Sequence, residues 1–276
     1  MAHIDLLPAR RGIAQLLVSL LLLLMAVMPV VADSSQWSCH GPYGGRFLAL
    51  AAFPDDAEGL LLFAGAEAGG LFFSQDGGDS WRRLGGLSAD LTISAIALSP
   101  AFAQDETLFV ASLGGGVFSS EDGGQSWTSC QADLPSPRVT GLALSPYFPT
   151  DHILLAATDV GLYRSEDAGA SWTAVGSGGS CLAVTTAQDA GEQFVAYAGT
   201  VSGLYMSADG GQTWEPTALA GLPVTAVALS PGYAKDHGVL AGTFGGAYLS
   251  WDGGETWLGP WVDDQVIYAV AFSPVS

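Results

Sequence analysis

The sequence predicts an all-β fold, a β-propeller of four-stranded antiparallel blades, and two observations lead to this prediction. First, the motif Ser-x-Asp-x-Gly-x-Ser/Thr-Trp occurs five times, beginning at Ser74, Ser120, Ser165, Ser207 and Ser250. The intervals of 46, 45, 42 and 43 residues match the length of one four-stranded blade. Second, similar short apolar strands surround each copy of the motif, with Gly and Pro between them.

Each repeat is expected to contain three strands before its motif and one after it, labelled A to D from the centre outward. Strand A is predicted over 93–100, 139–146, 224–231 and 266–274. Strand B is predicted over 108–112, 153–158, 194–200 and 239–243. Strand C leads into the motif, as in 161–165 and 203–207, and the motif Trp opens a short strand D.

The motif itself is expected to be structural. Its Asp can accept hydrogen bonds from N–H groups of its own turn, and its Gly residues allow the positive φ of a tight reversal. The Trp is large enough to fill the space between neighbouring sheets. Five copies indicate a structural role, since catalysis needs a residue once, and one carboxylate per turn is too few for calcium.

The A–B connections carry a second repeated pattern. Each places an Asp at its end, followed by Glu or His, in the pairs Asp105-Glu106, Asp151-His152 and Asp236-His237. Asp-His pairs are typical of metal or acid–base sites. Because the His is replaced by Glu in one repeat while the aromatic-x-x-Asp frame recurs, the pattern favours a role in shaping the loop.

The number of blades is left open between five and six. The sequence around Trp37 resembles a strand D, and 266–274 resembles a strand A, so five full repeats are accompanied by a partial one. Five blades with loose ends, a thin sixth blade, or a fragment of a longer propeller all fit this pattern. In the last case a second chain would complete the ring.

The first 32 residues predict a secretory signal peptide, with cleavage after Ala32 and a propeller over 33–276. Arg10 and Arg11 precede an apolar run over 16–28, and small residues follow Pro29. We therefore expect a secreted or extracytoplasmic protein that is not inserted in a membrane after cleavage. The rival interpretation is an uncut anchor over 13–31, which is just long enough to span a bilayer.

The net charge limits which molecules the chain can bind, and the number of cysteines limits which disulfides it can form. The 276-residue chain has 27 acidic and 8 basic residues and a net charge of −19, which repels phosphate backbones and anionic lipids. Nucleic acid is therefore not expected as a partner. Cys39, Cys130 and Cys181 cannot all pair within the chain, and we interpret them as small buried residues before disulfides, with the pairing left open.

The five motifs resemble the BNR or Asp-box repeat, and the resemblance covers the chain from about Trp37 onward. Propellers similar in this way include sialidases, xyloglucan-degrading endoglucanases, the sortilin luminal domain and the photosystem II assembly factors. The resemblance implies the blade type, whereas function has to be argued from a site. The assembly factors resemble seven-bladed propellers with a basic patch, and this chain is poor in basic residues, so the same partner does not follow.

The resemblance to hydrolases is not matched by their site residues. Sialidases usually carry an Arg-Ile-Pro segment and an arginine cluster, but residues 33–276 lack that segment and contain only Arg46, Arg82, Arg83, Arg138 and Arg164. A xyloglucanase normally sets two propellers side by side. Acidic pairs such as Asp263-Asp264 are expected by chance in so acidic a chain. We assign no catalytic residue, metal or cofactor, and keep a glycoside hydrolase, or a remnant of one, as the alternative.

A binding function has a more definite location. In a propeller, the D–A and B–C loops meet on one face, and the Asp boxes and A–B loops lie on the opposite face. Residues that vary between repeats on the first face are where specificity can be placed. We expect an exported, non-catalytic scaffold that binds a protein or glycan there. The candidate binding residues are Arg46, Glu67, Arg138, Asp159, Phe244 and Trp261.

Overall fold

The computed structural model describes residues 41–42, 45–55, 59–176, 179–189, 191 and 193–273. The chain divides into two units, 1–39 and 40–276, and all described residues belong to the second. The predicted signal peptide, the strand predicted around Trp37 and Cys39 lie outside the described residues. None of the described helices is long and apolar enough to cross a membrane.

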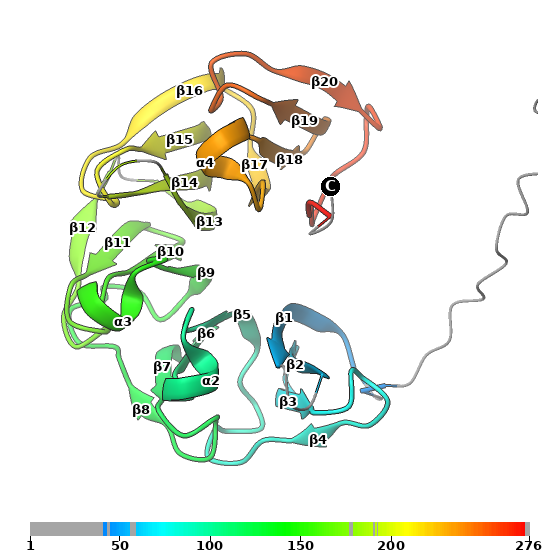
Figure 1. Ribbon diagram of the computed structural model, residues 1–276, viewed down its shortest axis with the longest axis vertical. Coiled ribbons are helices and arrows are strands. Elements are labelled where there is room, and N and C mark those ends of the chain that lie inside the picture. The colour runs from blue at the N-terminus through cyan, green and yellow to red at the C-terminus, as the bar shows by residue number, and fades with distance from the viewer. Residues whose placement is uncertain are drawn as a thin grey trace, which may run out of the picture. The chain divides into compact units, whose positions relative to one another are not determined.

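Five four-stranded antiparallel sheets follow one another around a common centre, which confirms the all-β propeller (Figure 1). Blade 1 contains β1 (Phe47–Asp55), β2 (Gly59–Ala66), β3 (Gly70–Ser74) and β4 (Arg82–Arg83). Blade 2 contains β5 (Ile93–Leu98), β6 (Leu108–Ser112), β7 (Gly116–Ser120) and β8 (Thr128–Ser129). Blade 3 contains β9 (Val139–Leu144), β10 (Leu154–Thr158), β11 (Gly161–Ser165) and β12 (Thr173–Val175).

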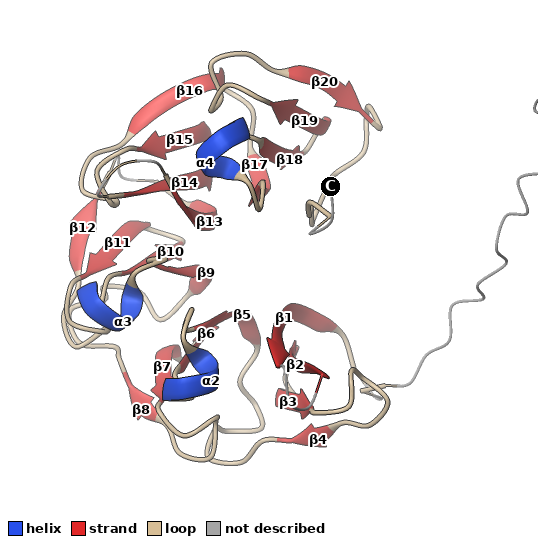
Figure 2. Cartoon of the chain, viewed as in Figure 1, coloured by secondary structure: helices blue, strands red, loops and turns tan. Residues whose placement is uncertain are grey.

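The last two blades are built in the same way. Blade 4 contains β13 (Cys181–Gln188), β14 (Phe194–Thr200), β15 (Gly203–Ser207) and β16 (Glu215–Ala220). Blade 5 contains β17 (Val224–Leu229), β18 (Val239–Thr243), β19 (Gly246–Ser250) and β20 (Leu258–Trp261). Short helical turns α2 (Phe102–Asp105), α3 (Phe148–Asp151) and α4 (Tyr233–Asp236) connect strands A and B in blades 2, 3 and 5 (Figure 2).

The core lies between neighbouring blades. Every residue of β6 and β10 is buried, because a second strand is covered on both faces by adjacent sheets. One cluster joins Phe109 of blade 2 to Leu142 and Phe148 of blade 3. Complete burial of a side chain of this size stabilises the fold by about 1.5 to 3 kcal/mol. These clusters explain why the second strands are continuous apolar runs rather than alternating ones.

Each Asp box is a closed network of hydrogen bonds, as predicted. In blade 2, the Ser120 hydroxyl donates to Asp122 Oδ1 over 2.7 Å, and the Ser126 backbone N–H donates to the same oxygen over 2.9 Å. The Ser126 hydroxyl donates to the other carboxylate oxygen of Asp122 over 2.5 Å. In the other four boxes the equivalent two hydroxyls, from the first Ser and from the Ser or Thr before the Trp, donate to the box Asp. These residues are Asp76, Asp167, Asp209 and Asp252.

The box Trp side chains close the turns. The indole N–H of Trp127 donates to the Gly124 carbonyl over 3.2 Å, and three other boxes repeat this bond. Trp172 is the exception, since its indole N–H donates to the Cys130 carbonyl of the preceding blade over 2.9 Å. This bond ties blade 3 directly to blade 2.

The A–B loops are shaped by their Asp residues, in agreement with the structural interpretation of the Asp-His pattern. The Ser145 hydroxyl donates to Asp151 Oδ2 over 2.5 Å, and the Ile153 N–H donates to Oδ1 over 3.0 Å. His152 adopts a left-handed conformation with φ 53°. Its backbone N–H donates a hydrogen bond to the Phe148 carbonyl, and this bond ends the helical turn. The Ala168 N–H in the Asp box of the same blade donates to the His152 carbonyl, and this bond joins the A–B loop to the box.

Two of the three cysteines are buried free thiols. Burial raises the pKa of Cys181 to about 12 and raises that of Cys130 as well. Both are therefore kept protonated at neutral pH, consistent with small packing residues.

The C-terminal segment begins the pattern of a further blade. In neighbouring blades, a hydroxyl of one strand A donates to the backbone carbonyl of the first residue in the next strand A. Ser94 donates in this way to the Val139 carbonyl, and Thr140 donates to the Cys181 carbonyl. Thr225 of blade 5 donates in the same way to the carbonyl of Ile267. The described part of the segment predicted as a strand over 266–274, residues 266–273, thus takes the place of a strand A beside blade 5. It forms no sheet with described strands, and the described propeller has five blades.

We expect Gly199→Ala to push blades 4 and 5 apart, because a Cβ at this position would lie 2.7 Å from the Val224 carbonyl oxygen. Overpacking of this kind costs about 1 to 3 kcal/mol of unfolding free energy. Urea unfolding measures the loss. Gly245→Ala is the matched control, since the nearest atom to its Cβ is 4.0 Å away. Equal stability of the two variants would show that the blades do not approach so closely.

Acidification is expected to weaken the boxes between about pH 4 and pH 2. Hydrogen bonds from Ser126 and Ser120 lower the pKa of Asp122 from 3.8 to about 2, and bonds from Thr256 and Ser250 do the same for Asp252. A carboxyl with a lowered folded-state pKa stabilises the fold above its unfolded value, and this stabilisation is lost as pH falls through the folded value.

Melting temperature against pH tests this expectation with Asp122→Asn. The variant should melt below the wild type at pH 5 to 7, and the difference should shrink toward pH 2. Asp79→Asn removes an equal charge without removing a box hydrogen bond and serves as the control. A difference that stays constant from pH 6 to pH 2 would contradict the assignment.

Candidate functional site

The two ends of the blades form two distinct faces. At one end, a B–C loop N–H donates to a D–A loop carbonyl in all five blades, as from Glu67 to Arg46 over 2.8 Å and from Phe244 to Pro223 over 3.4 Å. We call this end the rim face. The other end, the box face, holds the Asp boxes and A–B loops, which are joined by the bonds described above.

Four of the predicted binding residues pair with one another on the rim face. Arg46 Nη1 lies 3.3 Å from Glu67 Oε2, and Arg138 Nε lies 3.5 Å from Asp159 Oδ2. Asp159 also accepts the Ser136 hydroxyl over 2.6 Å. Such exposed pairs contribute at most about 1 kcal/mol each. Each arginine therefore already has a carboxylate partner in its own blade.

The two predicted aromatic residues lie together at the rim end of blade 5. Trp261 pairs with Ala247 in the β19–β20 ladder, and Phe244 lies in the turn that leads into β19. Their side chains are 45% and 54% exposed, respectively. Sequence variation between repeats had singled out both positions.

Further exposed apolar side chains extend this region. We define the apolar rim as Val201, Leu222, Phe244, Trp261 and Val262, all exposed at the rim end of blades 4 and 5. Sequence reasoning did not select Leu222 or Val262. Val262 has φ 59°, a conformation that a β-branched residue rarely adopts, and no residue pattern indicates it. The predicted residues thus divide into ion pairs in blades 1 and 3 and an apolar rim in blades 4 and 5.

The centre of the ring contains a hollow of about 430 Å³. It is lined by strand-A residues and the start of the following loops in blades 2 to 4, over 96–98, 142–146 and 184–186 with Pro100. These residues include no Asp or Glu. A glycosidase needs two carboxyl groups at its site, so the hollow does not provide one.

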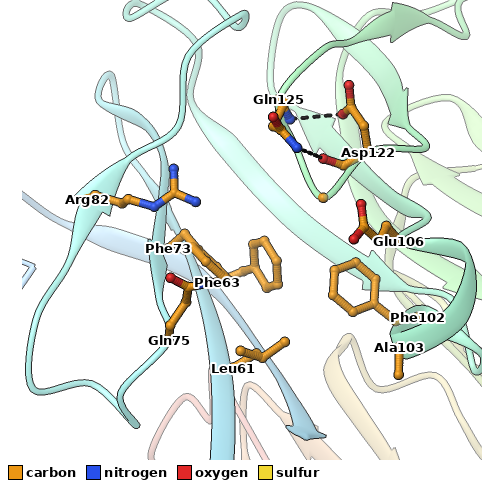
Figure 3. A pocket seen from close by; sticks show the side chains of 11 residues that line it. Leu61, Phe63, Phe73, Gln75, Arg82, Phe102, Ala103, Glu106, Asp122 and Gln125 are labelled. Carbon is orange, nitrogen blue, oxygen red and sulfur yellow. Dashed lines mark hydrogen bonds between the residues drawn. The ribbon is translucent and has the colours of Figure 1, made fainter. Parts of the chain in front are cut away.

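A second pocket, of about 270 Å³, lies on the box face between blades 1 and 2 (Figure 3). Phe63, Phe73 and Phe102 form its apolar wall, with the Arg82 guanidinium 4.9 Å from the centre of the Phe73 ring. Glu106 and Asp122 lie on the opposite side from Arg82 (Figure 3). Because its hydrogen bonds lower the pKa of Asp122, this carboxyl remains ionised and is unsuited to act as a general acid.

A family model described as photosynthesis system II assembly factor YCF48 matches residues 31–217. No curated protein sequence matches the chain significantly. Among solved structures, an ancestral GH74 enzyme is similar over 86% of this chain and 34% of its own, with TM-score 0.67 and 20% identity. The extracellular domain of a putative one component system from B. thetaiotaomicron is similar over 84% of this chain and 31% of its own, with TM-score 0.62 and 16% identity.

A structure of YCF48 bound to D1 peptide is similar over 82% of this chain and 72% of its own, with TM-score 0.58 and 20% identity. The chain thus spans about a third of the first two structures and a larger share of YCF48. At these identities the structural likeness shows the fold alone. Because the family model covers more than half of the sequence, the chain belongs to the photosynthesis system II assembly factor YCF48 family.

Proposed function

We propose that this chain is an extracytoplasmic, non-catalytic binding propeller that holds a segment of another protein against its apolar rim. The observation that carries the proposal is the group of exposed apolar side chains at one end of blades 4 and 5. Large apolar side chains that are exposed together at one end of a protein are typical of interaction sites. Aromatic residues such as Phe244 and Trp261 are also the side chains that most often anchor protein interfaces.

The chemistry of the apolar rim favours a protein segment over a glycan. Val201, Leu222 and Val262 offer no side-chain hydrogen bonds to sugar hydroxyls. The charged residues that could do so, such as Arg138 and Asp159, are engaged with each other. Family membership agrees with this ligand class, since the related YCF48 structure holds a peptide. Glycan binding remains an outcome that the experiment below can reveal.

We expect Phe244→Ser together with Trp261→Ser to weaken binding of a protein segment at least tenfold, because each anchor contributes on the order of 1 kcal/mol or more. Peptides selected from a displayed library against the wild-type chain provide the probe, and fluorescence polarisation measures their affinity. Leu50→Ser with Leu60→Ser is the matched control, since these side chains are 70% and 40% exposed on blade 1.

Two results would contradict the proposal. One is equal weakening by the rim and control variants. The other is turnover of fluorogenic glycosides, measured in parallel with a glycan array, that is lost on Asp263→Asn or Asp264→Asn. That second result would make the chain a glycoside hydrolase, the activity class of the GH74 structures that share its fold.

The extracytoplasmic location rests on the signal-like sequence over 1–32. We expect the mature chain recovered outside the cytoplasm to begin at Asp33, because the peptidase reads the small residue Ala32. N-terminal sequencing of the exported protein measures this directly. A mature chain that keeps residues 13–31 and stays with the membrane fraction would support the uncut anchor instead.

A further inference from the structure

A larger groove lies on the box face between blades 4 and 5, away from the apolar rim. Its volume is about 820 Å³. Residues of blade 4, including Asp189 and Glu215, form one wall, and Trp251 and Glu255 of the blade 5 box form the other. None of the residues that line it is an Arg or a Lys, and Lys235 on α4 is not among them. The lining residue that can become cationic is His237, which stands against four carboxylates, so the groove carries a net negative charge.

Four carboxylates line this groove, and one of them, Asp252, is held by the hydrogen bonds of its box. Among the described residues, no hydrogen bond or ion pair reaches the side chains of Asp189, Glu215 or Glu255. Oδ1 of Asp189 is shielded from solvent and has no hydrogen-bond partner. An unpartnered carboxylate oxygen that solvent does not reach is unfavourable, and a ligand donor can satisfy it only if the Asp189 side chain turns toward the groove that it lines.

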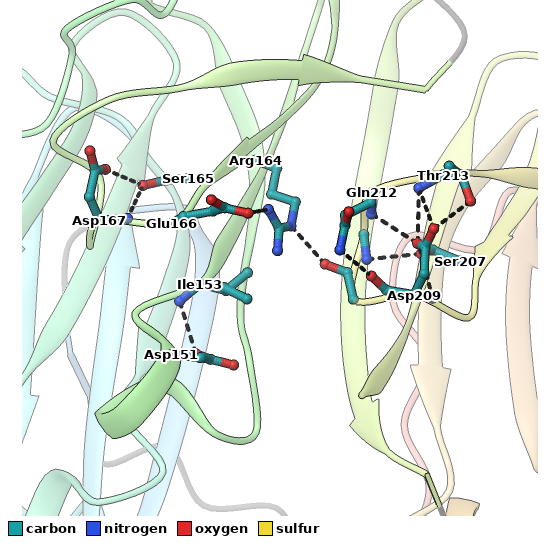
Figure 4. Close-up of polar contacts among 12 residues, drawn as sticks. Asp151, Ile153, Arg164, Ser165, Glu166, Asp167, Ser207, Asp209, Gln212 and Thr213 are labelled. Atoms are coloured by element: carbon teal, nitrogen blue, oxygen red, sulfur yellow. Dashed lines mark hydrogen bonds and ion pairs between the residues drawn. The ribbon is translucent and has the colours of Figure 1, made fainter. Parts of the chain in front are cut away.

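The corresponding place between blades 3 and 4 holds an arginine side chain of the chain itself (Figure 4). Between blades 3 and 4, the Arg164 side chain of β11 is only 8% exposed. Its Nε donates to the Gly210 carbonyl of the blade 4 box over 2.8 Å, and its Nη1 forms an ion pair with Glu166. A guanidinium of the chain itself therefore fills this groove.

The repeat explains why the groove between blades 4 and 5 remains open. Arg164 directly precedes the box Ser165, and the equivalent residue before Ser207 is Met206, which lines the groove. Arginine stands at this position in blade 3 alone, since the equivalent residues in blades 1, 2 and 5 are Phe73, Ser119 and Leu249. The groove has instead gained a carboxylate at Glu215, where blade 3 has Thr173 directly after the box Trp.

We propose that the groove between blades 4 and 5 binds a cationic side chain, an arginine or lysine in a basic segment of another protein. The carboxylates of Asp189, Glu215 and Glu255 supply charge and hydrogen-bond acceptors. Trp251, which is 51% exposed, offers aromatic surface on which a guanidinium can stack within about 6 Å. This site lies on the opposite face from the apolar rim and does not depend on it.

The test separates a specific site from general attraction to a chain of net charge −19. The probe is a labelled Gly-Ser peptide that carries three arginines, with lysine and citrulline versions, added to the full chain at 150 mM salt. We expect the arginine or lysine peptide to bind and the neutral citrulline peptide to bind at least tenfold more weakly. Absent binding of both cationic peptides, or equal binding of the citrulline peptide, overturns the proposal.

Charge-matched variants locate the site. The double variant Glu215→Gln with Glu255→Gln should weaken binding of the cationic peptide about tenfold. The control Asp79→Asn with Asp90→Asn removes the same charge elsewhere, and it should change the affinity for the peptide less than twofold. Met206→Arg should place in this groove the guanidinium that Arg164 places in its neighbour, and should therefore compete with the peptide.

Gln104→Arg on the exposed face of α2 adds an equal charge without entering the groove and is the control for Met206→Arg. Circular dichroism and melting temperature verify that each variant is folded. Equal effects of the groove variants and their controls would show diffuse attraction only and would overturn the site.

Discussion

The hydrogen-bonded turn between the third and fourth strands of each blade is the constraint on which the rest of the structure depends. In each box a serine hydroxyl and a backbone N–H both donate to one aspartate carboxylate. The backbone N–H of the residue after this aspartate donates to the carbonyl of the residue that ends the A–B loop. These bonds repeat around the box face, so each blade end is held in the same way. The apolar second strands can then pack between neighbouring sheets without any blade changing its orientation.

Because the box face fixes the blades, variation is tolerated at the rim face and in the grooves between blades. The rim-face loops keep one backbone hydrogen bond per blade, and their side chains differ widely. Blades 1 and 3 place ion pairs there, while blades 4 and 5 place exposed apolar residues. The grooves differ in the same manner, since Arg164 fills one and Met206 leaves the next open. A rigid repeated frame with variable surfaces is the arrangement expected of a binding scaffold.

The sequence predicted most of the fold because each repeat carries the same local signals. Strands 108–112, 194–200 and 203–207 have the predicted bounds, and the last of them begins at a Gly and ends at the box Ser. The segment over 266–274 was predicted as a strand, but it contacts blade 5 without joining a sheet, because a strand A is paired only by its own strand B. The pairing of Arg138 with Asp159 was not predicted, since equivalence between repeats gives a position but not the direction of a long side chain. The groove between blades 4 and 5 was missed because Asp189 follows β13, Glu215 begins β16 and Trp251 lies in the blade 5 box, so these residues are far apart in the sequence.

The central proposal is that this member of the family binds a protein segment at its rim face while the five Asp-box turns serve as the frame. Hydrogen–deuterium exchange of the chain, with and without a saturating selected peptide, tests it most directly. Slower exchange confined to the loops around Val201, Leu222, Phe244 and Val262, with unchanged exchange in the five box turns, is the predicted result. Protection centred on the central hollow, or spread evenly over all five blades, would contradict the claim.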